Sequence, residues 1–535
     1  MNTELLYLKP NVVVEPLFDQ WYAWSHLIPP ATASRNITER HLEIIDSYID
    51  APELHAAAVR DPKMLGGPFI DYGGQRVDEI RHLGEKTITE RACLIELSKA
   101  ITQLDGMLRA EAKGFSLQPL YARVPEPLRG YVELVYDLNN YPSFRVLESL
   151  LYRSTYYDRS AQSLALSLIS SDDRPFVLST PRLECPDTIE LRTPFDSDLV
   201  DWLFRTKYSP APWCKIRECL SVPHSKTELL RSLFTHEPPK PYKPYTGNGI
   251  RWRYFGHACI LIEAAGVSML FDPVLSYTYD SQISRYTYED LPERIDFVLI
   301  THNHQDHVLF ETLLQIRHKV GAVVVPPGGS GALQDPSLKL LLKQVGFSSV
   351  LELAEMESIP FGNGSITGLP FLGEHSDLNI RSKLAYLVRI GQHSLLFGAD
   401  SCNIDPALYA HVHREIGDVS ALFLGMECDG APLSWLYGPL LTKKIDRAMD
   451  QSRRLAGSNY EQAIDIVNRF HCREVYVYAM GQEPWLNYIM SLKYTKDSRP
   501  IVHSNRLIEE CRARGINAER LFGEREILLS SAAGV

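Results

Sequence analysis

The strongest chemical signal in the sequence is a cluster of three histidines and one aspartate within six residues. His302, His304, Asp306 and His307 directly follow the apolar run 295–301, which has the composition of a short buried strand. Histidines at positions i and i+2 of an extended segment point the same way, so His302 and His304 can bind one metal ion. Asp306 and His307, on the turn that follows, can reach a second ion about 3.5–4 Å away. The spacing therefore predicts a dinuclear metal site.

A dinuclear site needs more ligands than this cluster supplies, and two later strand ends offer them. Glu374 and His375 follow the apolar stretch 366–372, and Asp400 closes the apolar run 395–399. Charged groups that converge at the ends of buried strands are where α/β proteins place their sites. The residues alone therefore predict Asp400 as a ligand and leave Glu374 and His375 as alternatives for another.

The elements that must position these groups have the pattern of an α/β fold. Segment 252–266 alternates like a strand that runs into a turn, and 268–273 has the composition of its partner. The other short apolar strands are expected at 295–301, 323–325, 385–390, 395–398, 421–426 and 474–478. Several of the candidate ligands therefore stand where one of these strands ends.

A proline-rich stretch separates this half of the chain from the half before it. Residues 236–249 contain four prolines in a short polar run, which can continue neither a helix nor a central strand. A chain of 535 residues also exceeds what one hydrophobic core usually supports. We therefore predict two domains, 1–240 and 249–535.

The first domain is expected to be a separate mixed α/β unit, rich in tyrosine. Apolar spacing predicts helices over 38–60 and 86–113, with Thr87 and Thr89 as caps of the second helix. Strands around an Asn-Asn-Tyr-Pro turn, followed by a helix, are predicted within 128–157. This half shows no catalytic pattern, so its expected role is docking or dimerisation.

Composition narrows the classes of function. A net charge of −11 over the whole chain argues against nucleic acid binding, which needs a basic face. Nine scattered cysteines without a C-x-x-C pair indicate reduced thiols in a cytoplasmic protein. The N-terminus lacks a basic segment followed by an apolar run, and no window approaches about 18 apolar residues in succession. We therefore expect no secretory signal and no membrane span.

Five motifs taken together resemble the metallo-β-lactamase superfamily. They are FGHACILIE, LFDP, THNHQDH, GEHSD and GADS, and the resemblance covers about residues 250–485. It implies an αββα sandwich in which H-x-H-x-D-H, a later histidine, a bridging aspartate and a last histidine surround two metals. Asp400 would be the bridge, Asp272 would orient a ligand from behind, and His257 would lie near the rim of the site or in the core.

The chain departs from that superfamily at two ligand positions. Glu374 stands beside His375 where the third histidine is usual, and no histidine follows the strand at 474–478. Glu427, which closes the apolar strand at 421–426, or Glu483 could replace the last histidine, and we favour Glu427. Carboxylate-rich dinuclear sites suit iron or manganese, whereas zinc hydrolases favour imidazole. The departures therefore favour redox iron over hydrolytic zinc.

A narrower resemblance rests on the tyrosine-rich first half, the run GEHSDL and the run MECDGAPLSWLYGP. Together they are similar to the diiron β-hydroxylases of nonribosomal peptide synthesis, of the chloramphenicol-pathway type. The resemblance implies an O₂-dependent monooxygenase that hydroxylates the β-carbon of an aryl amino acid tethered to a carrier domain, with electrons from an external donor. It also implies that the first domain helps to form a homodimer and shapes access to the site.

The same resemblance implies a ligand set, with Glu374 rather than His375 as the ligand. One iron is held by His302, His304 and Glu374, the other by Asp306, His307 and Glu427, and Asp400 bridges them; Glu374 and Asp400 are the carboxylates expected at the catalytic centre. Trp435 and Tyr437 either line a substrate channel or pack in the core. The competing interpretation is a zinc-dependent thioesterase or phosphodiesterase of the same fold, which would work without O₂.

Overall fold

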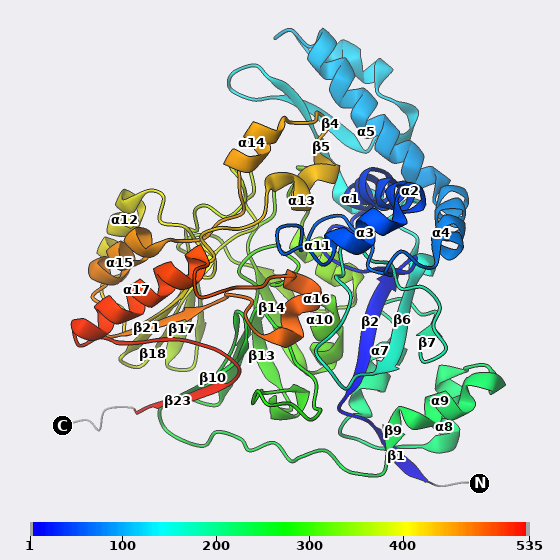
Figure 1. Cartoon of the computed structure of the whole chain (residues 1–535). Helices are drawn as coiled ribbons and strands as arrows, with labels where there is room; N and C mark the ends of the chain where they lie inside the picture. Colours follow the sequence, from blue (N-terminus) through cyan, green and yellow to red (C-terminus); the bar gives the residue numbers. More distant parts are fainter. Residues whose placement is uncertain (1–3, 531–535) are drawn as a thin grey trace.

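The computed structural model describes residues 4–530, and its second half contains two seven-stranded sheets (Figure 1). In each sheet a run of antiparallel strands continues into parallel strands. The first sheet consists, in spatial order, of β15 (Val350–Glu352), β14 (Val320–Val325), β13 (Ile295–Leu299), β12 (Val267–Phe271), β11 (Cys259–Ala264), β10 (Ile250–Gly256) and β23 (Arg525–Leu529). The second consists of β16 (Ser358–Phe361), β17 (Gly364–Leu369), β18 (Ala385–Ile390), β19 (His393–Phe397), β20 (Ala421–Gly425), β21 (Glu474–Tyr478) and β22 (Asn517–Arg520).

Helices cover the outer faces of the two sheets. Between the sheets lies an apolar core that includes Trp252, Phe271 and Phe397. Helices α12 (Pro406–Ile416), α15 (Tyr460–Arg469) and α17 (Arg499–Ala513) pack on the far side of the second sheet, while α10 (Phe310–Ile316) and α11 (Leu338–Gln344) lie beside the first. The layers are helix, sheet, sheet and helix, so the predicted αββα sandwich is confirmed.

The strands that carry candidate ligands end at neighbouring loops. Strand β13 leads into the loop 300–309, and β17, β19 and β20 lead into loops that begin at residues 370, 398 and 426. Strands β17 and β19 both pair antiparallel with β18, and β20 is parallel to β19, so these three strands run in one direction. Their carboxyl ends therefore lie on the same edge of the second sheet.

The first half is mixed α/β, as predicted. Its four-stranded sheet has the order β3-β2-β6-β7, and a small sheet β8-β1-β9 lies beside it. The strands are β1 (Leu5–Leu8), β2 (Val12–Phe18), β3 (Trp21–Tyr22), β6 (Gln162–Leu168), β7 (Ile189–Leu191), β8 (Ala211–Pro212) and β9 (Phe234–Thr235). The helices include α1 (Pro30–Asn36), α2 (Glu43–Asp50), α3 (Pro52–Ala58), α4 (Val77–Glu90), α5 (Ala92–Glu111), α7 (Asp198–Arg205), α8 (Trp213–Leu220) and α9 (Thr227–Ser232). The predicted hairpin and helix are β4 (Val132–Tyr136), β5 (Pro142–Val146) and α6 (Glu148–Leu151).

Two predicted helices of this half are divided in the structure. The segment 38–60 contains a π-helix, η1 (Ile37–Leu42), then α2, then α3, which begins at Pro52 because proline fits the first turn of a helix but not its interior. The segment 86–113 begins inside α4, and the chain breaks at Arg91 before α5. Thr87 and Thr89 are not caps, since their hydroxyls donate to carbonyls four residues earlier at 2.8 and 2.9 Å.

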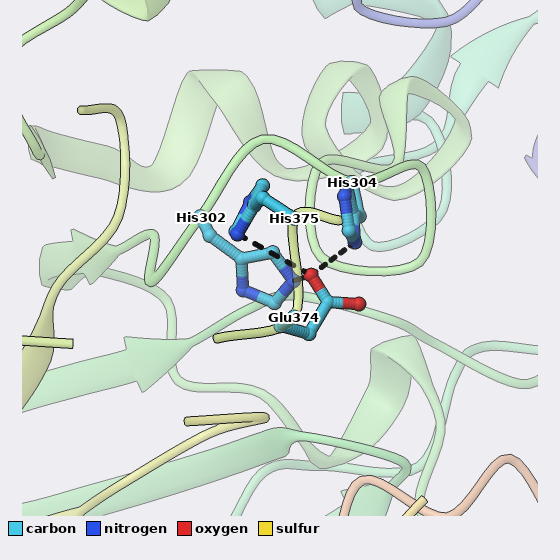
Figure 2. A group of neighbouring side chains, drawn as sticks. All are labelled: His302, His304, Glu374 and His375. Carbon is cyan, nitrogen blue, oxygen red and sulfur yellow. Dashed lines mark ion pairs between the residues drawn. The ribbon is translucent and has the colours of Figure 1, made fainter. Parts of the chain in front are cut away.

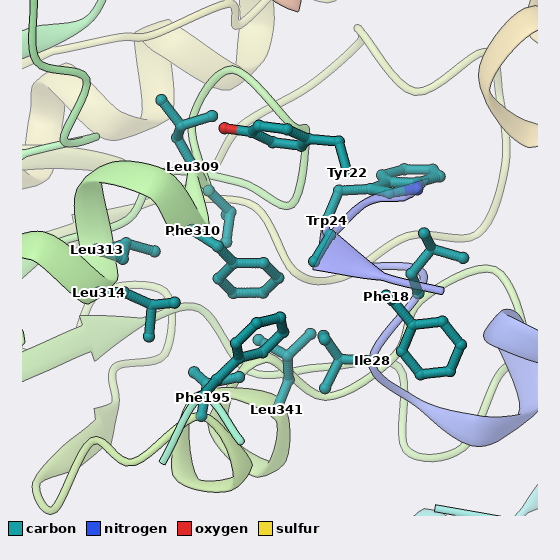
Figure 3. Close-up of a cluster of buried hydrophobic side chains, with 14 of the residues drawn as sticks. Phe18, Tyr22, Trp24, Ile28, Phe195, Leu309, Phe310, Leu313, Leu314 and Leu341 are labelled. Atoms are coloured by element: carbon teal, nitrogen blue, oxygen red, sulfur yellow. The ribbon is translucent and has the colours of Figure 1, made fainter. Parts of the chain in front are cut away.

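One apolar core is shared by the two halves of the chain (Figure 3). Phe18, Tyr22 and Phe195 of the first half belong to the same cluster as Phe310 and Leu341 of the second. The linking stretch 236–249 contains no helix or strand, as its prolines predict. No helix within residues 4–530 is long and apolar enough to cross a membrane. The shared core places the first half directly against α10, the helix that follows the histidine-rich loop.

Candidate metal centre

The loop after β13 turns its histidines inward. His302, His304 and His307 are 0%, 4% and 0% exposed, and the rings of His302 and His304 lie 4.7 Å apart. Glu374, His375 and Asp400 from loops of the second sheet lie beside them, so the group is buried inside the protein. Figure 2 shows the Glu374 carboxylate turned toward the imidazoles of His302, His304 and His375. Residues distant in sequence therefore converge on the predicted cluster.

Three overlapping groups of possible ligand atoms make up the centre, each with its atoms within 4.8 Å of one another. Asp400 connects them, because its Oδ2 lies 2.9 Å from Nε2 of His307 and 3.7 Å from Nε2 of His302. The groups are His302, His304, Glu374 and His375; His257, Asp306 and His307; and His302, His307 and Asp400. The groups overlap at His302 and His307, and Asp400 lies beside both of these histidines.

Both alternatives at the third histidine position face the centre. Oε2 of Glu374 lies 3.0 Å from Nδ1 of His304 and 3.8 Å from Nε2 of His302. His375 is 1% exposed and its ring lies 4.6 Å from that of His304, while its Nε2 has no hydrogen-bond partner. Glu374 adopts a left-handed backbone with φ of 66°, which lets two consecutive side chains turn toward one site.

Glu427 and Glu483 lie in different surroundings. Loss of solvent, and then the neighbouring carboxylates of Asp400 and Asp306, raise the pKa of Glu427 well above its usual range. Glu427 therefore shares the electrostatic environment of the centre, although it belongs to none of the three ligand groups. The buried carboxyl of Glu483 instead accepts a hydrogen bond from the hydroxyl of Tyr254. Neither glutamate belongs to the three ligand groups, so the choice of Glu427 stays a prediction.

Asp272 and Thr301 orient the histidines from behind. The Asp272 carboxylate accepts hydrogen bonds from the backbone N–H of Thr301 at 2.7 Å and from its hydroxyl at 2.6 Å, and it lies 2.8 Å from Nδ1 of His307. Because a carboxylate can only accept, Nδ1 of His307 carries a ring proton toward Asp272, and Nε2, which lies 2.9 Å from Oδ2 of Asp400, is the nitrogen that would bind a metal. The hydroxyl of Thr301 also lies 3.0 Å from Nδ1 of His302. Asp272 thus has the orienting position that the sequence motif implied.

His257 lies inside the site, although the resemblance implied a place at the rim or in the core. Its Nε2 is 3.1 Å from Oδ2 of Asp306 and 3.2 Å from Nε2 of His307. The residue occupies the tight turn between β10 and β11 with φ of 51°, which aims its side chain at the loop after β13. A histidine directly after Gly256, at a predicted strand turn, was the available sequence signal, but a lone histidine in a hairpin carries little weight by itself.

The residues present fit a pair of metal cations. Nε2 of His302, Oε2 of Glu374 and Oδ1 of Asp400 are buried with no hydrogen-bond partner, and each unpaired atom of this kind costs about 1–3 kcal/mol. Burial raises the pKa of Glu374 to about 7, against the opposing effect of His304. Cations would satisfy these atoms and allow the carboxylates to ionise together. The donors are imidazole and carboxylate, which iron accepts readily.

The comparisons with known proteins agree with both halves of the structure. Residues 7–238 match the diiron non-haem β-hydroxylase N-terminal domain, and residues 268–431 match the β-lactamase superfamily domain. The chain is 41% identical to the 4-amino-L-phenylalanyl-[CmlP-peptidyl-carrier-protein] 3-hydroxylase of Streptomyces venezuelae, over 98% of this chain and 99% of that one. The chain belongs to the diiron non-haem β-hydroxylase family. The predicted resemblance is confirmed, and this family implies iron as the metal.

Solved structures support the same membership in this β-hydroxylase family. The crystal structure of CmlA, a diiron β-hydroxylase from Streptomyces venezuelae, matches with a TM-score of 0.92 at 41% identity, covering 98% of this chain and 99% of that chain. A variant of the same β-hydroxylase matches with a TM-score of 0.90 at 41% identity, covering 98% of this chain and all of that chain. The likeness extends over both halves, so the family is a β-hydroxylase family rather than the metallo-β-lactamase fold alone.

Proposed function

We propose that the chain is an O₂-dependent diiron monooxygenase that hydroxylates the β-carbon of an aryl amino acid held as a thioester on a carrier domain of a nonribosomal peptide synthetase. The observation that carries this proposal is the 41% identity, along nearly the whole chain, to a hydroxylase named for a carrier-bound aminoacyl substrate. The buried cluster of imidazoles and carboxylates supports it, because the reaction requires redox-active metal.

The proposed ligand set uses the residues that converge at the centre. Asp400 would contact both ions, as its positions beside His302 and His307 suggest. One iron would be held by His302, His304 and Glu374, and the other by Asp306, His307 and Glu427, with Glu374 and Asp400 as the carboxylates of the catalytic centre. When bound, the two irons supply the chemistry that activates O₂ and removes the β-hydrogen, with electrons from an external donor.

The chain itself holds, orients and shields this centre. Asp272 holds a ring proton of His307 on Nδ1, which would direct Nε2 toward the metal. The surrounding side chains exclude bulk water, which strengthens every electrostatic contact within the site. The tethered substrate must therefore reach a closed site, and we propose that domain 1–240 shapes its access, forms a homodimer and docks the carrier, while 249–535 is the catalytic domain.

Metal content and a turnover assay test the proposed function. We expect protein purified without chelator to contain two irons and, after reduction, to add one oxygen atom to an aryl aminoacyl thioester on its carrier, only when O₂ is present. Free aryl amino acid is the matched control and should not react. Two zincs with O₂-independent release of the amino acid would instead establish the hydrolase alternative.

Paired variants separate the alternative ligands. Glu374→Ala should lose iron and hydroxylation, whereas His375→Ala at the next residue should keep two irons. Glu427→Gln should likewise lower iron content, whereas Glu483→Gln should change only the environment of Tyr254. The reverse result in either pair would show that the other residue of that pair is the ligand. Light scattering of the whole chain, with and without carrier, measures the proposed homodimer and the carrier complex.

A further inference from the structure

Tyr437 contacts the metal centre from outside the predicted ligand set. It ends α13 (Leu433–Tyr437), it is 1% exposed, and its hydroxyl lies 2.8 Å from Nε2 of His304. The opposite ring nitrogen of His304, Nδ1, lies 3.0 Å from Oε2 of Glu374. His304 therefore presents Nδ1 to the centre and Nε2 to Tyr437.

The two contacts of His304 determine where its proton must be. A neutral imidazole carries one N–H, so a ring that binds metal through Nδ1 carries the proton on Nε2. The hydroxyl oxygen of Tyr437 is in place to accept that proton in a hydrogen bond. Partners of this kind fix the tautomer and the orientation of a metal-binding histidine. Without an acceptor at Nε2, the proton could move to Nδ1 and block the ligand atom.

The segment that carries Tyr437 is held by the first half of the chain. Arg40, 6% exposed and within the π-helix η1, donates from Nη2 to the carbonyls of Trp435 at 2.7 Å and Leu436 at 2.9 Å. Arg35 of α1 donates from Nε to the carbonyl of Pro439 at 3.0 Å. These carbonyls flank the C-terminal end of α13, where a helix has no partners of its own for them. A π-helix widens the backbone and is frequent at functional sites.

We propose that Tyr437 is a positioning residue for His304 and that Arg40 holds Tyr437 in place, so that the first half of the chain acts on the iron site through this contact. The inference rests on the proposed role of His304 as an iron ligand. The first half of the chain then has a direct role at the metal centre. Its residues Arg35 and Arg40 fix the backbone of α13 and of the turn after it. Tyr437, the last residue of α13, orients the ligand His304.

Simple core packing is the competing explanation for Tyr437, and the neighbouring aromatic residue provides a control. Trp435 lies two positions earlier on α13, where side chains point to different faces of a helix, and it lines a cavity of about 640 Å³ between the two halves. It makes no contact with the metal centre among the described residues. A change at Trp435 therefore perturbs the same helix without touching His304.

The test replaces only the hydroxyl. Tyr437→Phe preserves ring volume, and we expect the affinity for iron, measured by competition with a chelator, to fall about 10- to 100-fold. The optical spectrum of the ferric protein should change as well, because the donor atom of His304 is no longer fixed. Trp435→Phe should leave both iron affinity and spectrum unchanged. Unchanged affinity and spectrum in Tyr437→Phe would overturn the proposal.

A double-mutant cycle tests the role of Arg40. Arg40→Met keeps most of the length of the side chain but has no N–H to donate to α13, so iron affinity should fall by part of the Tyr437→Phe effect. In the Tyr437→Phe background the same change should have little further effect, because Arg40 would act through the lost hydroxyl. Fully additive losses would refute this coupling. Failure of the unaltered chain to bind iron would refute the proposed function instead, so the two failures are distinguishable.

Discussion

Asp272→Asn is the sharpest test of how a residue behind the metal ligands controls the metal centre. Asp272 is fully buried and accepts from the N–H and the hydroxyl of Thr301, while its Oδ2 lies 2.8 Å from Nδ1 of His307. Asparagine has the same shape, but its Nδ2 is a donor where the aspartate has the acceptor Oδ2. The substitution therefore changes hydrogen-bond polarity at constant volume.

The structure sets the magnitude of the effect. The bond from the Thr301 N–H to Oδ1 survives, and the Thr301 hydroxyl can rotate, but His307 can accept from the new amide only if its own proton moves to Nε2. That nitrogen lies 2.9 Å from Oδ2 of Asp400 and is the proposed ligand atom. Loss of the hydrogen-bond partner of a metal-binding histidine typically lowers metal affinity 10- to 100-fold, which corresponds to about 1.4–2.7 kcal/mol.

Iron affinity by chelator competition measures this loss directly, and a second aspartate supplies the control. Asp296 on β13 accepts from the N–H and hydroxyl of Ser268 in the same sheet but has no contact with the metal ligands among the described residues. Asp296→Asn should leave iron affinity unchanged. If Asp272→Asn bound both irons as tightly as the unaltered chain, the tautomer argument for His307 would be wrong.

Three further predictions concern the bridge, the junction of the two halves and a buried lysine. Asp400→Ala should lose both metals, and full metal loading in this variant would exclude the bridge. Glu311→Gln should lower the free energy of unfolding in urea by about 1.5–3 kcal/mol, because buried Arg174 loses one of its two carboxylate partners and keeps Glu15 at 2.6 Å. Burial lowers the pKa of Lys207 from 10.5 to about 7. Between these two pH values Lys207 is protonated in the unfolded chain but not in the folded chain, so the free energy of unfolding rises with pH. Lys207→Met should therefore be more stable than the unaltered chain at about pH 6.5, with an advantage that shrinks toward about pH 9.5; a constant difference in urea midpoint would contradict this.

The sequence was most informative where ligands are adjacent in the chain. His302, His304 and His307 follow one predicted strand, so their convergence depends only on the local course of a short loop. The sandwich was predictable for a similar reason, because its strands are short apolar runs with regular boundaries. The choice between Glu374 and His375 was not predictable, because the left-handed backbone at 374 turns both side chains inward. Local spacing cannot reveal a backbone conformation of that kind.

Contacts between the two halves were also beyond the sequence. Tyr437 and Arg40 are separated by almost 400 positions, and either one alone has the pattern of an ordinary core or surface residue. The π-helix at Ile37–Leu42 has no distinct composition, so the segment 38–60 was predicted as one regular helix. Only the packing of α1 and η1 against the segment after α13 shows that these residues act together.

The charges of the centre give a physical reason for the carboxylates that we propose as ligands in place of histidines. Burial raises the pKa of Glu374 to about 7, and burial with the charges of Asp400 and Asp306 raises that of Glu427 well above its usual range. A raised pKa favours the protonated form, so metal binding to these carboxyls is expected to release protons. Once ionised, Asp306, Glu374, Asp400 and Glu427 together balance the charge of two divalent ions, which neutral imidazoles could not do. Anionic oxygen ligands of this kind also stabilise the higher oxidation state of iron, so the substitutions favour a metal that must change its charge during the reaction.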